Sequence, residues 1–312
     1  MTQAWSAGSL SVVVPLYNEE ANVEPLLSGI LDVVRGLGIP SELIVVDDGS
    51  SDGTLDALGE LAPANPEVVV VALSRNYGQT QALQAGFDRA RGEAIVTMDG
   101  DLQNDPRDIP RLLEELAGGA DVVSGWRRQR QDALVVRKVP SWAANWLIRR
   151  STGVPIHDQG CSLKAYRRPV VRSLDLYGDM HRFIGVLTMP LSTRIAEIEV
   201  RHHPRVAGES KYGLSRILKV LADLFTIQTI TRFRERPLHW FTLLASPFLL
   251  AALIIGVVLL VVAPGPVLSA VFLITVTSFV ACALFGLLAN WIIEGAARER
   301  PFATFREWDT QA

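Results

Sequence analysis

Short apolar runs alternate with helical patterns through the first 200 residues of the chain. Five runs have the length and composition of buried strands, at residues 10–14, 43–46, 68–73, 94–98 and 120–123. Between the first two runs, apolar residues recur at the spacing of one helix face: Val23, Leu26, Leu27, Ile30, Leu31 and Val34. Strands this apolar are typically buried on both faces of a parallel sheet. The pattern therefore predicts an α/β domain with a mostly parallel sheet and helices on both faces.

The last third of the chain has a different pattern. From Leu238 to Ile293, 56 consecutive residues contain no Asp, Glu, Lys or Arg, and Ala263-Pro264-Gly265-Pro266 interrupts the run once. A helix that spans a membrane needs about 20 apolar residues. The run therefore predicts a two-helix transmembrane hairpin within 237–293, with helices at about 238–262 and 267–293, and it excludes a wholly soluble protein.

The segment between the two regions is amphipathic. From Tyr212 to Ile230 the apolar residues fall on one helical face, and Arg232, Arg234 and Arg236 follow directly before the first span. A helix packed on the polar domain would show the same pattern. The basic residues and the position next to the predicted membrane favour an interfacial amphipathic helix with a basic linker, at 212–236.

Charge also predicts the orientation of the hairpin. Basic residues precede the first span and follow the second, whereas the loop between the spans carries no charge. Basic flanks favour the cytoplasmic side of a membrane. The first ten residues lack the basic and apolar regions of a signal peptide. We therefore expect a multi-pass protein of the inner or plasma membrane, with a cytoplasmic domain (1–211), a cytoplasmic tail (294–312) and both termini cytoplasmic.

Overall composition adds two limits. The formal net charge is -3, and the two cysteines, Cys161 and Cys282, fall in different predicted regions, which excludes a disulfide framework and fits a reducing cytosol. Basic residues concentrate in 126–150 and again in 205–211. No nucleic-acid-binding motif accompanies them, so we expect no nucleic-acid partner. A phosphate-rich site at a membrane explains both clusters.

Polar motifs follow four of the predicted strands. They read PLYNE at 15–19, DDGSSDG at 47–53, SRNYGQ at 74–79 and DGDLQ at 99–103. Ligands of parallel sheets bind beyond the carboxyl ends of the strands. The four motifs therefore predict one site at one edge of the sheet.

The motif after the fourth run has the ligands of a hard divalent cation. Asp99 and Asp101 are two residues apart, so in an extended segment their carboxylates point the same way, and Gln103 lies two further on. Such cations prefer oxygen ligands and bridge to phosphates. A plain Asp-Gly turn is the alternative interpretation.

The motif after the second run has three interpretations. Asp47 and Asp48 could cap the following helix, or accept hydrogen bonds from a ribose or a base. The neighbouring polar motifs favour the second role. Residues 49–53 also match the nucleophile elbow of serine hydrolases, with Ser51 as the nucleophile. Two acids beside a developing oxyanion disfavour that reaction.

Seven motifs in this order, followed by two spans, closely resemble the polyisoprenyl-phosphate glycosyltransferases of family two, the group of dolichyl-phosphate mannose synthase, bactoprenol glucosyltransferase and undecaprenyl-phosphate aminoarabinose transferase. The motifs are PLYNE, VVDDGSSDGT, RNYGQTQALQAG, DGDLQNDP, WRRQRQD, HDQGCSLKAYRR and GESKYG. The resemblance runs through nearly the whole chain. It departs at Gly100, where alanine is more usual, and the sequence shows no consequence of this change.

The resemblance implies an A-type nucleotide-sugar glycosyltransferase domain, inversion at the sugar carbon, and a set of site residues. It assigns nucleoside and donor binding to Pro15, Tyr17, Glu19, Asp48, Gln79 and Asp99. It assigns Mg²⁺ or Mn²⁺ to Asp99, Asp101 and Gln103. It assigns donor or lipid phosphate to Arg127, Arg137, Ser141, Arg205 and Lys211, and more loosely to Arg182. Asp158 matches a residue proposed as a base or orienting group, and we expect catalysis to depend on Asp158, Asp101, Arg205 and Lys211.

The predicted reaction transfers a hexose or related sugar from a UDP- or GDP-linked donor to undecaprenyl or dolichyl phosphate. A processive polysaccharide synthase would need a QxxRW motif and more spans, and neither is present. A membrane-anchored nucleotide-binding protein without catalysis is the main alternative, and a serine hydrolase at Ser51 is a weaker one. The sequence leaves open the sugar, the nucleotide and a homo-oligomer.

Overall fold

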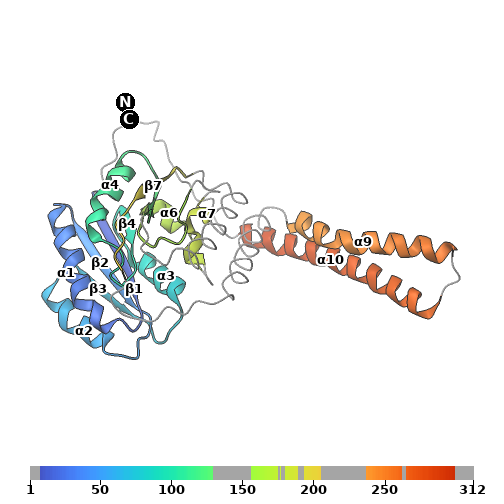
Figure 1. Ribbon diagram of the computed structural model, residues 1–312, viewed down its shortest axis with the longest axis horizontal. Helices are drawn as coiled ribbons and strands as arrows, with labels where there is room; N and C mark the ends of the chain where they lie inside the picture. The colour runs from blue at the N-terminus through green and yellow to red at the C-terminus, as the bar shows by residue number, and fades with distance from the viewer. Residues whose placement is uncertain are drawn as a thin grey trace. The chain divides into compact units, whose positions relative to one another are not determined.

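The computed structural model describes residues 8–128, 156–174, 176, 180–188, 193–204, 237–261 and 265–298. These residues belong to two compact units, an α/β domain up to residue 204 and a pair of C-terminal helices (Figure 1). The predicted interfacial helix at 212–236 lies outside the described residues.

The α/β domain is built on a seven-stranded sheet with the order β3-β2-β1-β4-β6-β5-β7. The strands are β1 (Leu10–Leu16), β2 (Ser41–Asp47), β3 (Val68–Ala72), β4 (Ala94–Thr97), β5 (Val122–Trp126), β6 (Lys164–Arg167) and β7 (Ile195–Glu199). Strand β6 runs antiparallel to β4 and β5, and the other four pairs are parallel. The mostly parallel sheet predicted from the sequence is confirmed.

Two strands depart from the sequence-based prediction. The apolar pattern of β3 predicts burial on both faces, and this is wrong, because β3 is an edge strand whose residues are all partly or fully exposed. Strands β6 and β7 were not predicted. Strand β6 has four residues, KAYR, and β7 reads IAEIE at the other edge of the sheet. Neither has the continuous apolar run of a central parallel strand.

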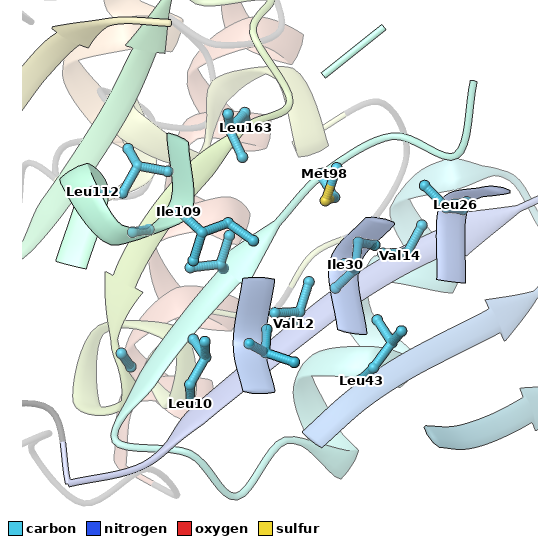
Figure 2. Packing of buried hydrophobic residues seen from close by; sticks show 14 of the residues in the cluster. Leu10, Val12, Val14, Leu26, Ile30, Leu43, Met98, Ile109, Leu112 and Leu163 are labelled. Carbon is cyan, nitrogen blue, oxygen red and sulfur yellow. The ribbon is translucent and has the colours of Figure 1, made fainter. Parts of the chain in front are cut away.

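Helices cover both faces of the sheet. They are α1 (Glu20–Gly36), α2 (Thr54–Leu61), α3 (Gln79–Arg89), α4 (Ile109–Ala117), α6 (Arg168–Arg172) and α7 (Ile184–Leu187), with short 3₁₀ turns η1 (Ala62–Ala64), η2 (Pro106–Asp108) and η3 (Met180–Phe183). Helices α1 and α4 pack on one face, where Leu26, Ile30 and Ile109 meet Val12 and Val14 of β1 (Figure 2). All six apolar positions of the predicted helix within α1 are buried.

Helix α3 packs on the other face at very short distance. A Cβ atom at Gly86 would lie 2.3 Å from Val13 Cγ1, so only glycine permits this approach. Helix α3 begins at Gln79 and packs against β1 and β2.

Gly100 has a packing role that the sequence did not show. A Cβ atom at this position would lie 2.0 Å from Cδ2 of Leu16, which is buried at the end of β1. The loop after β4 can therefore rest directly on Leu16 because residue 100 has no side chain.

The second unit consists of α9 (Pro237–Val261) and α10 (Pro266–Arg298). They pack through small residues: Ala245 and Ala252 are buried, and a Cβ atom at Gly286 would lie 2.9 Å from Phe241 Cβ. Both helices are long and apolar enough to cross a membrane, over Leu238–Val261 and Pro266–Ile292. Helix α10 continues to Arg298, beyond the predicted end of the span, because Glu294, Ala296 and Ala297 favour helix without being a membrane segment.

Candidate active site

The four polar motifs meet at one edge of the sheet, as predicted. Asn18 N donates to Ser50 Oγ at 2.9 Å, which joins the loops after β1 and β2. Tyr77 N donates to Asp48 Oδ1 at 2.8 Å, which joins the loops after β2 and β3. Gln79 Nε2 donates to Asp99 Oδ1 at 2.8 Å, which joins α3 to the loop after β4. The loops therefore form one continuous surface.

The loop after β2 requires glycine at position 49. Gly49 has φ +66°, a left-handed conformation that strains other residues, and a Cβ atom there would lie 2.3 Å from the carbonyl carbon of Arg75. The close approach lets Asp48 accept hydrogen bonds from Tyr77 N and Gly78 N, at 2.8 and 2.9 Å. Asp48 is buried, and a carboxylate has about four acceptor positions, so it retains capacity for a ligand donor.

Other residues expected to bind the nucleoside lie at or after the end of β1, which Asp48 contacts through Leu16 O. Pro15 lies near the end of β1, Tyr17 follows it and is 46% exposed, and Glu19 accepts a hydrogen bond from Asn22 Nδ2. Tyr77 was not predicted. Its ring is equally exposed and lies under the Arg75 guanidinium, 4.7 Å from the ring centroid, and hydrogen bonds from Ser74 and Arg75 lower the pKa of its hydroxyl. The sequence signal that could have identified Tyr77 is the presence of an aromatic residue within a polar motif.

Ser51 lacks the surroundings of a nucleophile. Its side chain is exposed, and its Oγ lies 3.4 Å from Asn18 Oδ1. An amide oxygen cannot take up the serine proton as an imidazole does. This contact disfavours the serine hydrolase interpretation.

Asp99 and Asp101 are close enough to influence each other. Burial raises the pKa of Asp99, a hydrogen bond from Ser162 lowers it, and the charge of Asp101 raises it further. Asp101 Oδ1 accepts a hydrogen bond from Gln103 N at 3.2 Å, which closes a turn. Leu102 lies in this turn with a left-handed backbone conformation, φ +59°. Within the described ranges no three Asp, Glu, His or Cys side chains form a metal cluster. Two mutually repelling carboxylates beside Gln103 fit a hard cation that keeps several water ligands.

Arg127 and Asp158 form a buried bidentate ion pair. Arg127 Nε lies 2.7 Å from Asp158 Oδ2, and the second guanidinium nitrogen lies 2.9 Å from Oδ1. Their side chains are 10% and 8% exposed. Burial alone would lower the pKa of Arg127, but the hydrogen bonds and charge of Asp158 outweigh it and raise this pKa above its ordinary value. Because Arg127 occupies both oxygens of Asp158, this carboxylate is arranged as a charge partner.

Glu197 of β7 holds the segment that presents Asp158. Glu197 Oε1 accepts from His157 N at 2.8 Å and from Asp158 N at 3.1 Å, and Oε2 lies 2.7 Å from His157 Nδ1. The His157 ring also stacks on Trp126, with centroids 4.7 Å apart. His157 is thus held at the surface by a hydrogen bond and by ring stacking. Glu197 was missed because β7 was not predicted.

The segment after β7 is attached to the loop after β4. His203 N donates to Gln103 O at 2.9 Å, and His203 Nε2 lies 3.2 Å from Asp105 Oδ2. Arg201 N donates to Asp108 Oδ2 at 2.6 Å. Hydrogen bonds from Arg107 hold the pKa of Asp105 well below its usual range. The sequence contains no motif for this attachment.

Five of the predicted residues are not placed by their side chains. Arg137, Ser141, Arg205 and Lys211 lie outside the described residues, and so does the side chain of Arg182. The backbone of Arg182 belongs to η3, which meets the start of α3 through the 2.7 Å contact between His181 Nδ1 and Thr80 Oγ1.

Comparison with known families and proteins gives a consistent result. Residues 11–175 match the model of glycosyl transferase family 2. The chain is 48% identical to a dodecaprenyl-phosphate galacturonate synthase of Rhizobium johnstonii over 236 residues, 74% of this chain and 70% of the relative. It is 43% identical to an undecaprenyl-phosphate 4-deoxy-4-formamido-L-arabinose transferase of Pectobacterium carotovorum over 250 residues, 80% of this chain and 76% of the relative.

A solved structure shares the fold. Glucosyl-3-phosphoglycerate synthase from Mycobacterium tuberculosis, in complex with Mn²⁺ and UDP-glucose, superposes with a TM-score of 0.54 at 22% identity, over 71% of this chain and 78% of that one. The A-type architecture expected from the sequence is confirmed.

Proposed function

Because this chain belongs to glycosyl transferase family 2, and is thus a glycosyltransferase, we propose that it transfers a sugar from a nucleotide-diphosphate sugar to polyprenyl phosphate. The main support for the proposal is the acceptor for which two relatives of this chain are named. Two proteins that are 48% and 43% identical over most of both chains are named for a dodecaprenyl- or undecaprenyl-phosphate acceptor. Two helices apolar enough to span a membrane agree with a lipid acceptor.

In this proposal Asp99, Asp101 and Gln103 hold Mg²⁺ or Mn²⁺. The donor set fits, and glucosyl-3-phosphoglycerate synthase, which shares the fold, was crystallised with Mn²⁺ or Mg²⁺ together with UDP. When bound, the cation neutralises charge on the departing nucleoside diphosphate. Pro15, Tyr17, Glu19, Asp48 and Gln79 bind the nucleoside part of the donor.

The acceptor needs little help from a base. A phosphate monoester has a second pKa of about 6, so it is largely a dianion at neutral pH and can attack the anomeric carbon directly. This attack displaces the nucleoside diphosphate in one step and inverts the sugar carbon. Asp158, with both oxygens engaged by Arg127, then serves to orient Arg127 and to balance developing positive charge on the sugar. Arg127, Arg137, Ser141, Arg182, Arg205 and Lys211 bind the phosphates of donor and acceptor.

The proposed location follows from the solubility of the two substrates. The donor is soluble in water and the lipid acceptor stays in the bilayer, so the reaction takes place at the membrane surface. We place the catalytic domain and both termini on the cytoplasmic side, since basic residues flank both predicted spans.

The test uses full-length protein in vesicles that contain undecaprenyl phosphate. UDP-galacturonate, UDP-4-deoxy-4-formamido-arabinose, UDP-glucose and GDP-mannose are added separately with Mg²⁺ or Mn²⁺. We expect one donor to yield a lipid-linked sugar by mass spectrometry and an equal amount of nucleoside diphosphate. Nucleotide binding without product from any donor would contradict the proposal and favour the non-catalytic alternative.

A further inference from the structure

Lys164 is a buried cation that the proposed mechanism does not use. It lies on β6, an interior strand of the sheet, directly opposite Thr97 of β4 and Ser124 of β5, and it is 3% exposed. Lysine is almost never fully buried unless it is paired, because removing an ammonium from water is costly. Its position beside the active site therefore calls for an explanation.

The ammonium has one hydrogen-bond acceptor in the part of the chain that the structure describes. Lys164 Nζ donates to Gln159 O at 3.1 Å, and it forms no ion pair there. Two polar neighbours also lack partners in these residues, namely both amide atoms of Gln159 and Oγ of Ser124. Within the described residues, a local salt bridge therefore does not explain why Lys164 is buried.

Gln159 belongs to the turn that presents Asp158 to Arg127. Cys161 N donates to Asp158 O at 3.3 Å and closes the turn. Glu197 binds the start of this segment through the backbone of His157 and Asp158. Lys164 binds its middle through Gln159 O, so the turn is fixed from two sides.

Charge links Lys164 to the same residue. Burial lowers the pKa of Lys164 and the positive charge of Arg127 lowers it as well, whereas Cys161, Asp158 and Asp99 raise it. The charges of Asp158 and Asp99 likewise raise the pKa of Arg127. Asp158 bonds Arg127 directly, and Lys164, which is buried in the sheet, adds a second positive charge to its surroundings.

We propose that Lys164 is a positioning residue for sugar transfer, which fixes the turn 158–161 through Gln159 O and thereby keeps Asp158 oriented toward Arg127 when Arg127 binds phosphate. The inference rests on the proposed function. Loss of a buried partner that orients a site residue typically costs about 10- to 100-fold in activity.

The first experiment compares K164M, K164R and Y166F in full-length protein. K164M should lower kcat by about 10- to 100-fold with little change in the KM for the nucleotide sugar, since Lys164 supports another residue. K164R keeps the charge and should recover part of the loss. Tyr166 lies two residues along the same strand and is also fully buried, so Y166F, which should stay near wild-type turnover, controls for disturbance of β6.

The second experiment asks whether Lys164 acts through Asp158. In a D158N background, K164M should cause little further loss of kcat, because either change alone already disrupts the orientation of residue 158 toward Arg127. Losses that multiply, or an unchanged kcat in K164M, would overturn the inference. If K164M does not fold, K164Q replaces it under the same criterion.

The proposed function and this inference can fail separately. A wild type that transfers no sugar contradicts the function alone. Lys164 is then judged by urea unfolding of wild type, K164M, D158N and the double variant: coupled losses of stability support the inference, and additive losses overturn it.

Discussion

At the scale of single residues, charges of alternating sign run through the site. Asp99 and Asp158 act on Arg127, and both also act on Lys164. Arg127 and Asp158 are joined directly by their bidentate contact. A buried charge is stable when opposite charges compensate it. The opposite charges in the site therefore compensate one another before any substrate binds. Substituting one of these residues changes the electrostatic environment of the others.

Asp101→Asn tests the cation site. An amide offers one neutral oxygen in place of a charged carboxylate, so the cation should bind weakly and kcat should fall on the order of 10²-fold. Asp101 is partly exposed and its carboxylate accepts a hydrogen bond from Gln103 N within its own turn, so the fold should persist. The measurement is turnover against Mn²⁺ concentration. Asp88→Asn, an exposed change on α3, is the control, and near-normal turnover of D101N at saturating metal would refute the assignment.

Gly100→Ala tests the packing under the same loop. The new methyl group would meet Leu16 Cδ2, which is buried and has little room to move. Overpacking of this kind costs about 1–3 kcal/mol. We expect urea unfolding in detergent to show that loss, and Leu16→Val, which removes both Cδ atoms, to restore part of it in the double variant. Equal stability of G100A and wild type would show that the loop can shift freely.

At the scale of elements, the loop after β4 is joined to the segment after β7. His202 pairs with Asn104 as an isolated bridge, His203 bonds to Gln103 O, and Asp105 lies beside His203. Arg205 follows two residues after His203. These contacts connect the proposed cation loop to the segment that directly precedes Arg205 in the sequence.

Asp105→Asn should weaken this connection in a pH-dependent way. The pKa of Asp105 is lowered in the folded protein, whereas an unfolded aspartate has a pKa of about 3.9. The stabilising contribution of Asp105 is therefore fully present above about pH 4, and it is lost as the pH falls through the folded pKa.

We expect D105N to be less stable than wild type at pH 7, and the gap to narrow steadily below about pH 4. Thermal unfolding of both full-length proteins across this range checks the prediction. Asp88→Asn again serves as the control. A gap that stays constant down to pH 2 would show that the carboxylate charge of Asp105 does not stabilise the fold.

The sequence predicted elements with long patterns better than short ones. Helix α1 and strands β1 and β2 follow clear apolar periodicity, and α9 and α10 follow from composition. Strand β6 could not be predicted because it has only four residues, one of them the charged Lys164, and it is a strand only through its pairing with β4 and β5. The Arg127–Asp158 pair joins residues 31 positions apart, so motif spacing could suggest both residues but not their contact.

At the scale of the whole molecule, two units with opposite solvent requirements share one chain. The α/β domain buries its apolar residues in its own core. In α9 and α10 large apolar side chains remain uncovered in the described structure, such as Leu253, which is 60% exposed. Exposed apolar surface of this extent marks an interaction site, and in the proposed function this site is the membrane. The full-length protein should therefore stay with membranes at high salt.

A truncated variant that ends at Arg236 separates the two roles. It keeps the loops after β1 to β4, the Arg127–Asp158 pair and the predicted interfacial helix, and it lacks α9 and α10. Since the hairpin contributes no predicted site residue, nucleotide and Mn²⁺ should bind as in the full chain. Isothermal titration with UDP and GDP checks this, and D101N in the same truncation should lose the metal dependence.

The same truncated variant tests how the domain meets the lipid. The predicted helix would bury about six large apolar side chains, each worth about 1.5–3 kcal/mol before ordering costs, and its basic flank attracts anionic lipid. Binding to anionic vesicles should therefore be reversible and weaker at high salt, because salt screens the charges. Transfer to polyprenyl phosphate should be reduced but detectable, since the hairpin only raises the local concentration of the site at the bilayer. Co-sedimentation and product formation at two salt concentrations measure both effects. A folded variant that binds nucleotide, ignores vesicles at low salt and still glycosylates lipid at the full-length rate would contradict the interfacial helix.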